Sequence, residues 1–125
     1  MPELKLYSWN INGIRAAEKK GFLNWLAASS GDVVAVQEIK AFEFQLSAAL
    51  RNPDGYRADW CSAEKAGYSG VGTFSKLPLL DRQAGLGDSV FDCDGRTLIC
   101  DYGKFVFFNI YFPNGGRGPD YVRHK

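Results

Sequence analysis

Two apolar segments of this chain end abruptly in amide and carboxylate side chains. The first covers residues 4–11 and carries Asn10 near its end. The second covers residues 32–40 and reaches Glu38 after a run of branched residues. Both segments have the branched and aromatic composition of buried strands. Burying an ionised carboxylate is costly unless a partner compensates its charge, so Glu38 predicts a bound partner.

A side-by-side pairing of these two strands predicts a metal site. Asn10 and Glu38 would then lie at the same edge of one sheet, and both offer oxygen atoms. An all-oxygen site suits a hard cation such as Mg²⁺. Each residue also has a plainer interpretation when taken alone. Asn10 could form a turn, and Glu38 could be a surface carboxylate, but their matching positions favour the site.

Composition narrows the class of protein without identifying it. The 125 residues indicate one domain, and 46% hydrophobic with 23% charged residues is ordinary for a globular protein. The net charge of +1 gives no reason to propose a membrane surface or a strongly basic nucleic-acid footprint. Three cysteines without a close pair or a signal peptide predict an intracellular, cytoplasmic location. A lone histidine, His124, weakens zinc and histidine-dependent mechanisms.

Hydrophobic periodicity predicts an α/β protein. Helices are expected over residues 15–28 and 42–50, and residues 119–125 look like the first turn of another helix. Further strands are expected over four segments, namely residues 56–63, 70–75, 97–102 and 104–112. The order predicts helices packed outside a sheet, followed by an antiparallel meander.

A second polar cluster lies at the end of the last expected strand. Tyr111, Asn114 and Arg117 form a set that could contact phosphate, because phenol, amide and guanidinium groups all donate hydrogen bonds. Tyr111 could equally be a core aromatic residue, and Asn114 could belong to a turn. The glycine-rich residues 67–72 lack the ending of a P-loop and are typical of a tight turn.

Taken together, five segments resemble the exonuclease III family of apurinic/apyrimidinic endonucleases, within the endonuclease/exonuclease/phosphatase superfamily. The segments occur in the family's order and span nearly the whole chain, at residues 8–16, 36–40, 67–72, 94–96 and 111–118. Five ordered motifs are much more specific than any one of them.

The resemblance implies a fold and its extent. Residues 1–125 would form the N-terminal half of a four-layer α/β sandwich, with a mixed β-sheet that carries helices on one face. The C-terminal half of the family domain would be absent. That half carries an Asp-x-Asn motif and a late Ser-Asp-His motif, for which this sequence has no counterpart.

The resemblance also implies an activity, which is the hydrolysis of phosphodiester bonds in double-stranded DNA at abasic sites during base-excision repair. The cofactor would be Mg²⁺ or Mn²⁺, with Glu38 as a direct ligand and Asn10 ordering the site and the attacking water. Tyr111 and Asn114 would lie near the scissile phosphate. The residues expected to contact DNA are Arg15, Lys20, Tyr68, Arg96 and Arg117.

The missing motifs predict little activity for this chain alone and leave an alternative open. The alternative is a non-catalytic half-domain that associates with itself or complements another chain. A homodimer would then form through an exposed inner sheet surface, with Leu6, Val34, Val36 and Phe108 as candidate residues. A phosphoinositide or sphingomyelin phosphodiesterase is a third interpretation, against which the motif at residues 111–118 argues.

Overall fold

Two β-sheets and a layer of short helices make up the described part of the chain, which in this computed structural model is residues 4–65, 67–87 and 95–112. The first sheet, sheet A, has the order β1-β2-β4-β3. The second, sheet B, has the order β5-β6-β7. The strands are β1 (Leu6–Asn10), β2 (Val33–Gln37), β3 (Arg57–Cys61), β4 (Val71–Ser75), β5 (Asp81–Ala84), β6 (Thr97–Asp101) and β7 (Val106–Ile110).

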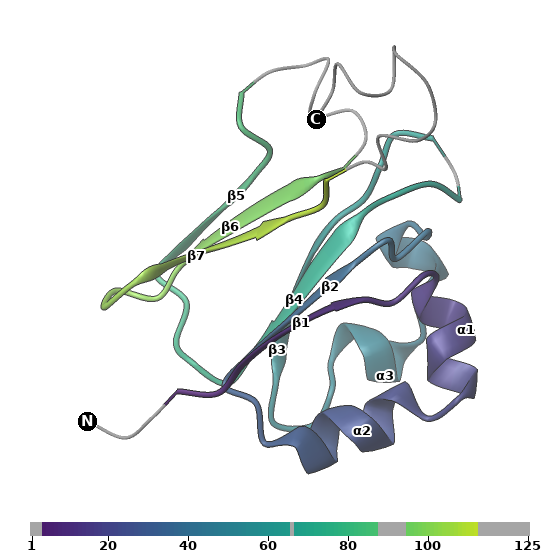
Figure 1. The fold of residues 1–125 in the computed structure, drawn as a ribbon, viewed down its shortest axis with the longest axis horizontal. Coiled ribbons are helices and arrows are strands. Elements are labelled where there is room, and N and C mark those ends of the chain that lie inside the picture. The colour runs from purple at the N-terminus through teal and green to yellow at the C-terminus, as the bar shows by residue number, and fades with distance from the viewer. Residues whose placement is uncertain (1–3, 66, 88–94, 113–125) are drawn as a thin grey trace.

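The helices cover one face of sheet A, and sheet B covers the other (Figure 1). The helical segments are α1 (Ile14–Lys19), α2 (Phe22–Ser29), a 3₁₀ turn η1 (Glu43–Gln45) and α3 (Ala48–Arg51). Sheet A is mixed, because β1 runs parallel to β2 while β4 is antiparallel to both β2 and β3. This arrangement confirms the predicted α/β fold, with a mixed sheet and helices on one face.

Alternation along β2 divides its side chains between two apolar layers. Val34 and Val36 point toward the helices, where they pack in one cluster with Phe22 of α2. Val33 points the other way and packs with Leu98 of β6. A strand buried on both faces reads as a continuous apolar run, which is the pattern that β2 shows.

The second sheet corrects the expectation of an exposed inner sheet surface. Val34 and Val36 are completely buried, and the opposite face of β2 and β4 is covered by sheet B of the same chain. Apolar exposure lies elsewhere. Leu6 on β1 is 50% exposed, and Phe108 on β7 is 53% exposed.

The helices are shorter than the sequence suggests. The helix expected over residues 15–28 breaks between α1 and α2, where Gly21 adopts a left-handed conformation with φ +98°. The segment expected as a helix over residues 42–50 divides into η1 and α3, and the Ser47 hydroxyl accepts a hydrogen bond from the Leu50 amide at the start of α3. The turn expected over residues 119–125 lies outside the described residues. No helix in the described part of the chain is long and apolar enough to cross a membrane.

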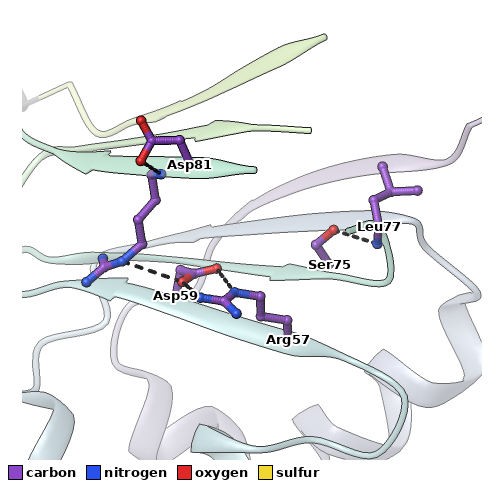
Figure 2. A network of polar contacts seen from close by, with 6 residues as sticks. Arg57, Asp59, Ser75, Leu77 and Asp81 are labelled. Carbon is purple, nitrogen blue, oxygen red and sulfur yellow. Dashed lines mark hydrogen bonds and ion pairs between the residues drawn. The ribbon is translucent and has the colours of Figure 1, made fainter. Parts of the chain in front are cut away.

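The buried carboxylate of Asp59 on β3 forms two ion pairs, one of which joins the two sheets. The Asp59 carboxylate, only 4% exposed, contacts Arg57 Nε at 3.2 Å on its own strand. It also contacts Arg82 Nε of β5 at 3.8 Å (Figure 2). Because a buried carboxylate needs a charged partner, Asp59 ties one edge of sheet B to sheet A.

Close packing in sheet A leaves no room for a side chain at position 72. A Cβ atom added to Gly72 would lie 2.5 Å from two carbon atoms of the Trp60 ring. We therefore expect Gly72→Ala to lower the free energy of unfolding by about 1–3 kcal/mol, the usual cost of overpacking a core. Urea denaturation measures the change. The same substitution in a Trp60→Leu background should cost less, because the clashing ring is gone, and equal costs in the two backgrounds would contradict this reason.

Candidate active site

The parallel pairing of β1 and β2 brings their polar ends to one edge of sheet A. Asn10, the last residue of β1, is in register with Gln37, the last residue of β2. Glu38 follows Gln37 directly. The strands thus pair side by side as the sequence predicts, and the amide and the carboxylate belong to neighbouring strand ends.

Glu38 has a backbone conformation that few residues other than glycine adopt. Its φ is +56°, in the left-handed region, where such strain persists only when the surroundings hold it. Two hydrogen bonds do so, because Gly13 N donates to the Glu38 carbonyl at 2.7 Å and Ile39 N donates to the Gly70 carbonyl at 3.1 Å. Since the strand alternation stops here, the Glu38 side chain is free to turn toward sheet B.

Tyr111 meets Glu38 from the second sheet. Its hydroxyl donates a hydrogen bond to Glu38 Oε1 at 3.1 Å, and the residue is 8% exposed. Tyr111 follows β7 directly, and its backbone amide donates to the Arg96 carbonyl at 2.8 Å. Two residues that the sequence singled out for one site therefore touch, although 73 positions separate them.

The oxygen atoms at this edge are of the kind that a hard cation binds. Glu38 offers a carboxylate, and the exposed Asn10 offers an amide oxygen that accepts a hydrogen bond from Asn12 N at 3.2 Å. Among the described residues, no three His, Cys, Asp or Glu side chains gather around a common point. This oxygen donor set suits Mg²⁺, which often binds one or two carboxylates and keeps several water molecules. It does not suit zinc, which prefers nitrogen and sulfur ligands.

A basic groove of about 880 Å³ opens beside α1. Arg15 and Lys20, both predicted to contact DNA, line it together with Lys19 and Lys40. Glu18 also lines the groove, and its carboxylate accepts a hydrogen bond from the Ser47 hydroxyl at 2.6 Å. The groove therefore gathers more positive than negative charge, which suits a phosphate backbone.

Lys19 and Lys40 were not among the predicted contact residues. Lys19 could have been suspected from its place in a lysine pair at the end of a helix. Lys40 belongs to the same short motif as Glu38, and the Arg15 guanidinium donates to its backbone carbonyl at 3.1 Å. That hydrogen bond holds Arg15 and Lys40, which belong to two different sequence motifs, side by side in the lining of the groove.

The remaining predicted residues fall into three groups. Tyr68 is half exposed and directly follows Gly67, which lines the groove. The Lys65 ammonium lies over the Tyr68 ring, 4.4 Å from the ring centre. Arg96 is only 2% exposed, a position that does not favour the predicted contact with DNA. Asn114 and Arg117 lie outside the described residues, so their contacts stay predictions.

Two ionisable groups between the sheets, Cys100 and Tyr102, are held in their neutral forms. Burial raises the pKa of the Cys100 thiol, and burial likewise raises the pKa of the Tyr102 hydroxyl. Both therefore stay protonated at neutral pH. Cys100 is thus poorly suited to act as a nucleophile, because the thiolate is the reactive form.

Comparison with known proteins agrees with this geometry. The profile of the Endonuclease/Exonuclease/phosphatase family matches residues 7–125. The chain is 33% identical to an exodeoxyribonuclease of Bacillus subtilis over 123 residues, which are 98% of this chain and 48% of that protein. It is 34% identical to the DNA repair nuclease APEX1 of Danio rerio over 117 residues, which are 92% of this chain and 38% of that protein.

Solved structures show the same fold. The catalytic domain of APE2 from Xenopus laevis superposes with a TM-score of 0.81 at 25% identity, covering 98% of this chain and 49% of that one. The chain thus spans about half, or less, of the length of these relatives. With a family profile over almost its whole length and repair nucleases among its relatives, the chain belongs to the endonuclease/exonuclease/phosphatase family, alongside the exodeoxyribonucleases and AP endonucleases.

Proposed function

We propose that this chain supplies one half of the active site of a metal-dependent nuclease that hydrolyses DNA at abasic sites. The observation that carries the proposal is the hydrogen bond between the Tyr111 hydroxyl and the Glu38 carboxylate. It joins a candidate metal ligand to a candidate phosphate contact, and Lys40, two residues after Glu38, lines the basic groove. The repair nucleases among the relatives support DNA as the substrate.

Each residue of the site has a distinct task in this proposal. Glu38 and Asn10 would hold Mg²⁺ or Mn²⁺, which when bound would neutralise charge that develops on the phosphate and the leaving oxygen. Tyr111 donates its single hydroxyl proton to Glu38 in this structure, and that contact fixes the direction of its ring. When Glu38 holds the metal, the hydroxyl would donate to a phosphate oxygen instead. Asn114 would donate a further hydrogen bond to the phosphate. Such prearranged donors stabilise the charge of the transition state.

The basic groove would bind the DNA backbone beside this site. Arg15, Lys19, Lys20 and Lys40 line it, and contacts of this kind position a duplex without reading its sequence. The half-exposed Tyr68 lies next to the groove and offers an aromatic ring. We propose double-stranded DNA with abasic sites as the partner, and the cytoplasm as the location of the protein.

A second candidate function is favoured by apolar surface at two places. All of β1 is exposed, including Leu6, and in the described part of the chain β1 pairs only with β2. Val106 and Phe108 are about half exposed on the outer face of β7. An exposed edge strand and an apolar face attract a further polypeptide. The chain could therefore act as a half-domain that pairs with a second copy or complements another chain.

Nuclease activity should depend on a second half of the domain. The 125-residue chain alone should cleave an abasic-site duplex at least about 100-fold more slowly than a full-length relative, because general acid–base groups are worth about 10²–10⁴ in rate. A chimera that carries these residues in place of the matching segment of the Bacillus subtilis exodeoxyribonuclease should regain activity with Mg²⁺. Gel electrophoresis of a labelled duplex measures both rates.

Two substitutions in the chimera provide the controls. Glu38→Gln removes the carboxylate charge, and Tyr111→Phe removes one donor, a change that typically costs about 10²–10³ in rate. A folded chimera that stays inactive, or one that loses no activity on either substitution, would contradict the proposed function.

The isolated chain should bind Mn²⁺ weakly through Glu38. One carboxylate and one amide leave most of the coordination shell to water. We expect Mn²⁺ to broaden the NMR signals of residues around Glu38 and Asn10, and Glu38→Gln to remove that broadening. Asp54→Asn, which changes an exposed carboxylate on another loop, is the matched control. Broadening that is centred elsewhere and survives Glu38→Gln would show that the metal site is misassigned.

Self-association is the test of the second candidate. If the edge of β1 and the outer face of β7 find a partner in solution, light scattering coupled to gel filtration should give the mass of a dimer. Leu6→Lys and Phe108→Lys should return the mass to that of a monomer, since inward or edge charges block strand pairing. A monomeric wild-type chain that unfolds cooperatively would rule the homodimer out.

A further inference from the structure

A pair of buried amide side chains lies directly behind the contact between Glu38 and Tyr111. Gln37 is the last residue of β2 and is 9% exposed, while Asn109 of β7 is 1% exposed. Gln37 Nε2 donates a hydrogen bond to Asn109 Oδ1 at 3.0 Å. This side-chain hydrogen bond crosses from sheet A to sheet B.

Both amides make further hydrogen bonds to their surroundings. Asn109 Nδ2 shares its two hydrogen atoms among the Gly72 carbonyl at 2.8 Å, Thr73 Oγ1 at 3.2 Å and the Val36 carbonyl at 3.3 Å. Gln37 Nε2 also donates to Ser8 Oγ at 3.1 Å. The amides therefore join β1, β2, β4 and β7 at one point. Because hydrogen bonds are directional and an unsatisfied buried amide is costly, this network admits one relative placement of the two sheets.

Each amide lies next to one partner of the active-site contact. Gln37 immediately precedes Glu38, whose left-handed φ of +56° must be held in place by its neighbours. Asn109 is two residues before Tyr111, so the two side chains share one face of the extended chain. Both ends of the hydrogen bond from Tyr111 to Glu38 are thus anchored by one buried bridge.

From this geometry we infer that Gln37 and Asn109 are positioning residues, which fix the two sheets so that Tyr111 reaches Glu38. Apolar packing alone would hold the sheets together but would not fix the position of one sheet along the other. The inference deepens the proposed function and rests on it for its effect on the metal site. The effect on the contact between Tyr111 and Glu38 does not depend on that function.

The ion pair between Arg82 and Asp59 offers a matched control. It also joins sheet A to sheet B, but through β3 and β5 (Figure 2). Its 3.8 Å separation and the 46% exposure of the Arg82 side chain make it a looser connection. Arg82→Ala therefore removes an inter-sheet contact without touching the amide bridge.

The test follows the Tyr111 hydroxyl by NMR in the full 125-residue chain labelled with ¹³Cζ-tyrosine. Tyr111→Phe assigns the signal, and Glu38→Ala gives its position when the hydrogen bond is lost. Gln37→Met keeps the length of the side chain but removes its donors, and Asn109→Leu removes the other end of the bridge. Both should move the Tyr111 signal toward its position in Glu38→Ala, whereas Arg82→Ala should leave it in place.

Three results would overturn the inference. The first is an unmoved Tyr111 signal in folded Gln37→Met or Asn109→Leu protein. The second is an equal movement in Arg82→Ala, which would indicate general loosening. The third is loss of the fold in Gln37→Met, which would show that the bridge is needed for folding rather than for placement. Urea denaturation of each variant separates these cases.

Mn²⁺ affinity, measured from the free-ion signal in electron paramagnetic resonance, separates this inference from the proposed function. Gln37→Met should weaken Mn²⁺ binding by about 10–100-fold, as loss of groups that orient a metal ligand usually does. An unchanged affinity would overturn the connection to the metal site. If the wild-type chain binds no Mn²⁺ at Glu38 while the Tyr111 signal still moves as expected, the proposed function fails and the positioning role stands.

Discussion

The packing of sheet B against sheet A is the interaction on which the candidate site depends. Sheet A contributes Asn10 and Glu38, and sheet B contributes Tyr111. The apolar layer between the sheets, formed around Val33, Val71 and Leu98, provides the favourable free energy that holds them together. Apolar burial has no preferred direction, so the precise placement must come from polar contacts such as those of Gln37 and Asn109.

Much of the fold follows from the hydrophobic pattern. The continuous apolar run of β2 and the aromatic run of β7 were recognisable as strands because branched and aromatic residues favour a pleated, buried surface. β5 was not recognised, since its sequence from Asp81 to Ala84 is mostly polar and exposed. The division into two sheets was also missed, because strand order within one half depends on contacts far apart in the sequence.

The site was predictable where its residues end regular strands. Asn10 and Glu38 stand out because the pattern of a buried strand calls for apolar residues at their positions. The left-handed φ of Glu38 could not be predicted, because residues 36–40 contain no glycine, asparagine or proline that would mark a turn. Gln37 and Asn109 carried a signal that was overlooked. A lone amide inside an apolar strand often marks a buried hydrogen-bond network.

The 73 positions between Glu38 and Tyr111 have a consequence for the order in which the site forms. β1 and β2 are joined through two short helices, and β6 and β7 form a hairpin, so each unit can assemble from nearby residues. The contact between the units closes a much longer loop, and long-range contacts form slowly because chain entropy opposes them. A partial opening between the sheets would separate the phenol from the carboxylate while both sheets stayed intact. Such an opened chain would be folded but incompetent, and the fraction of time spent closed would then set an upper limit on any chemistry at this site.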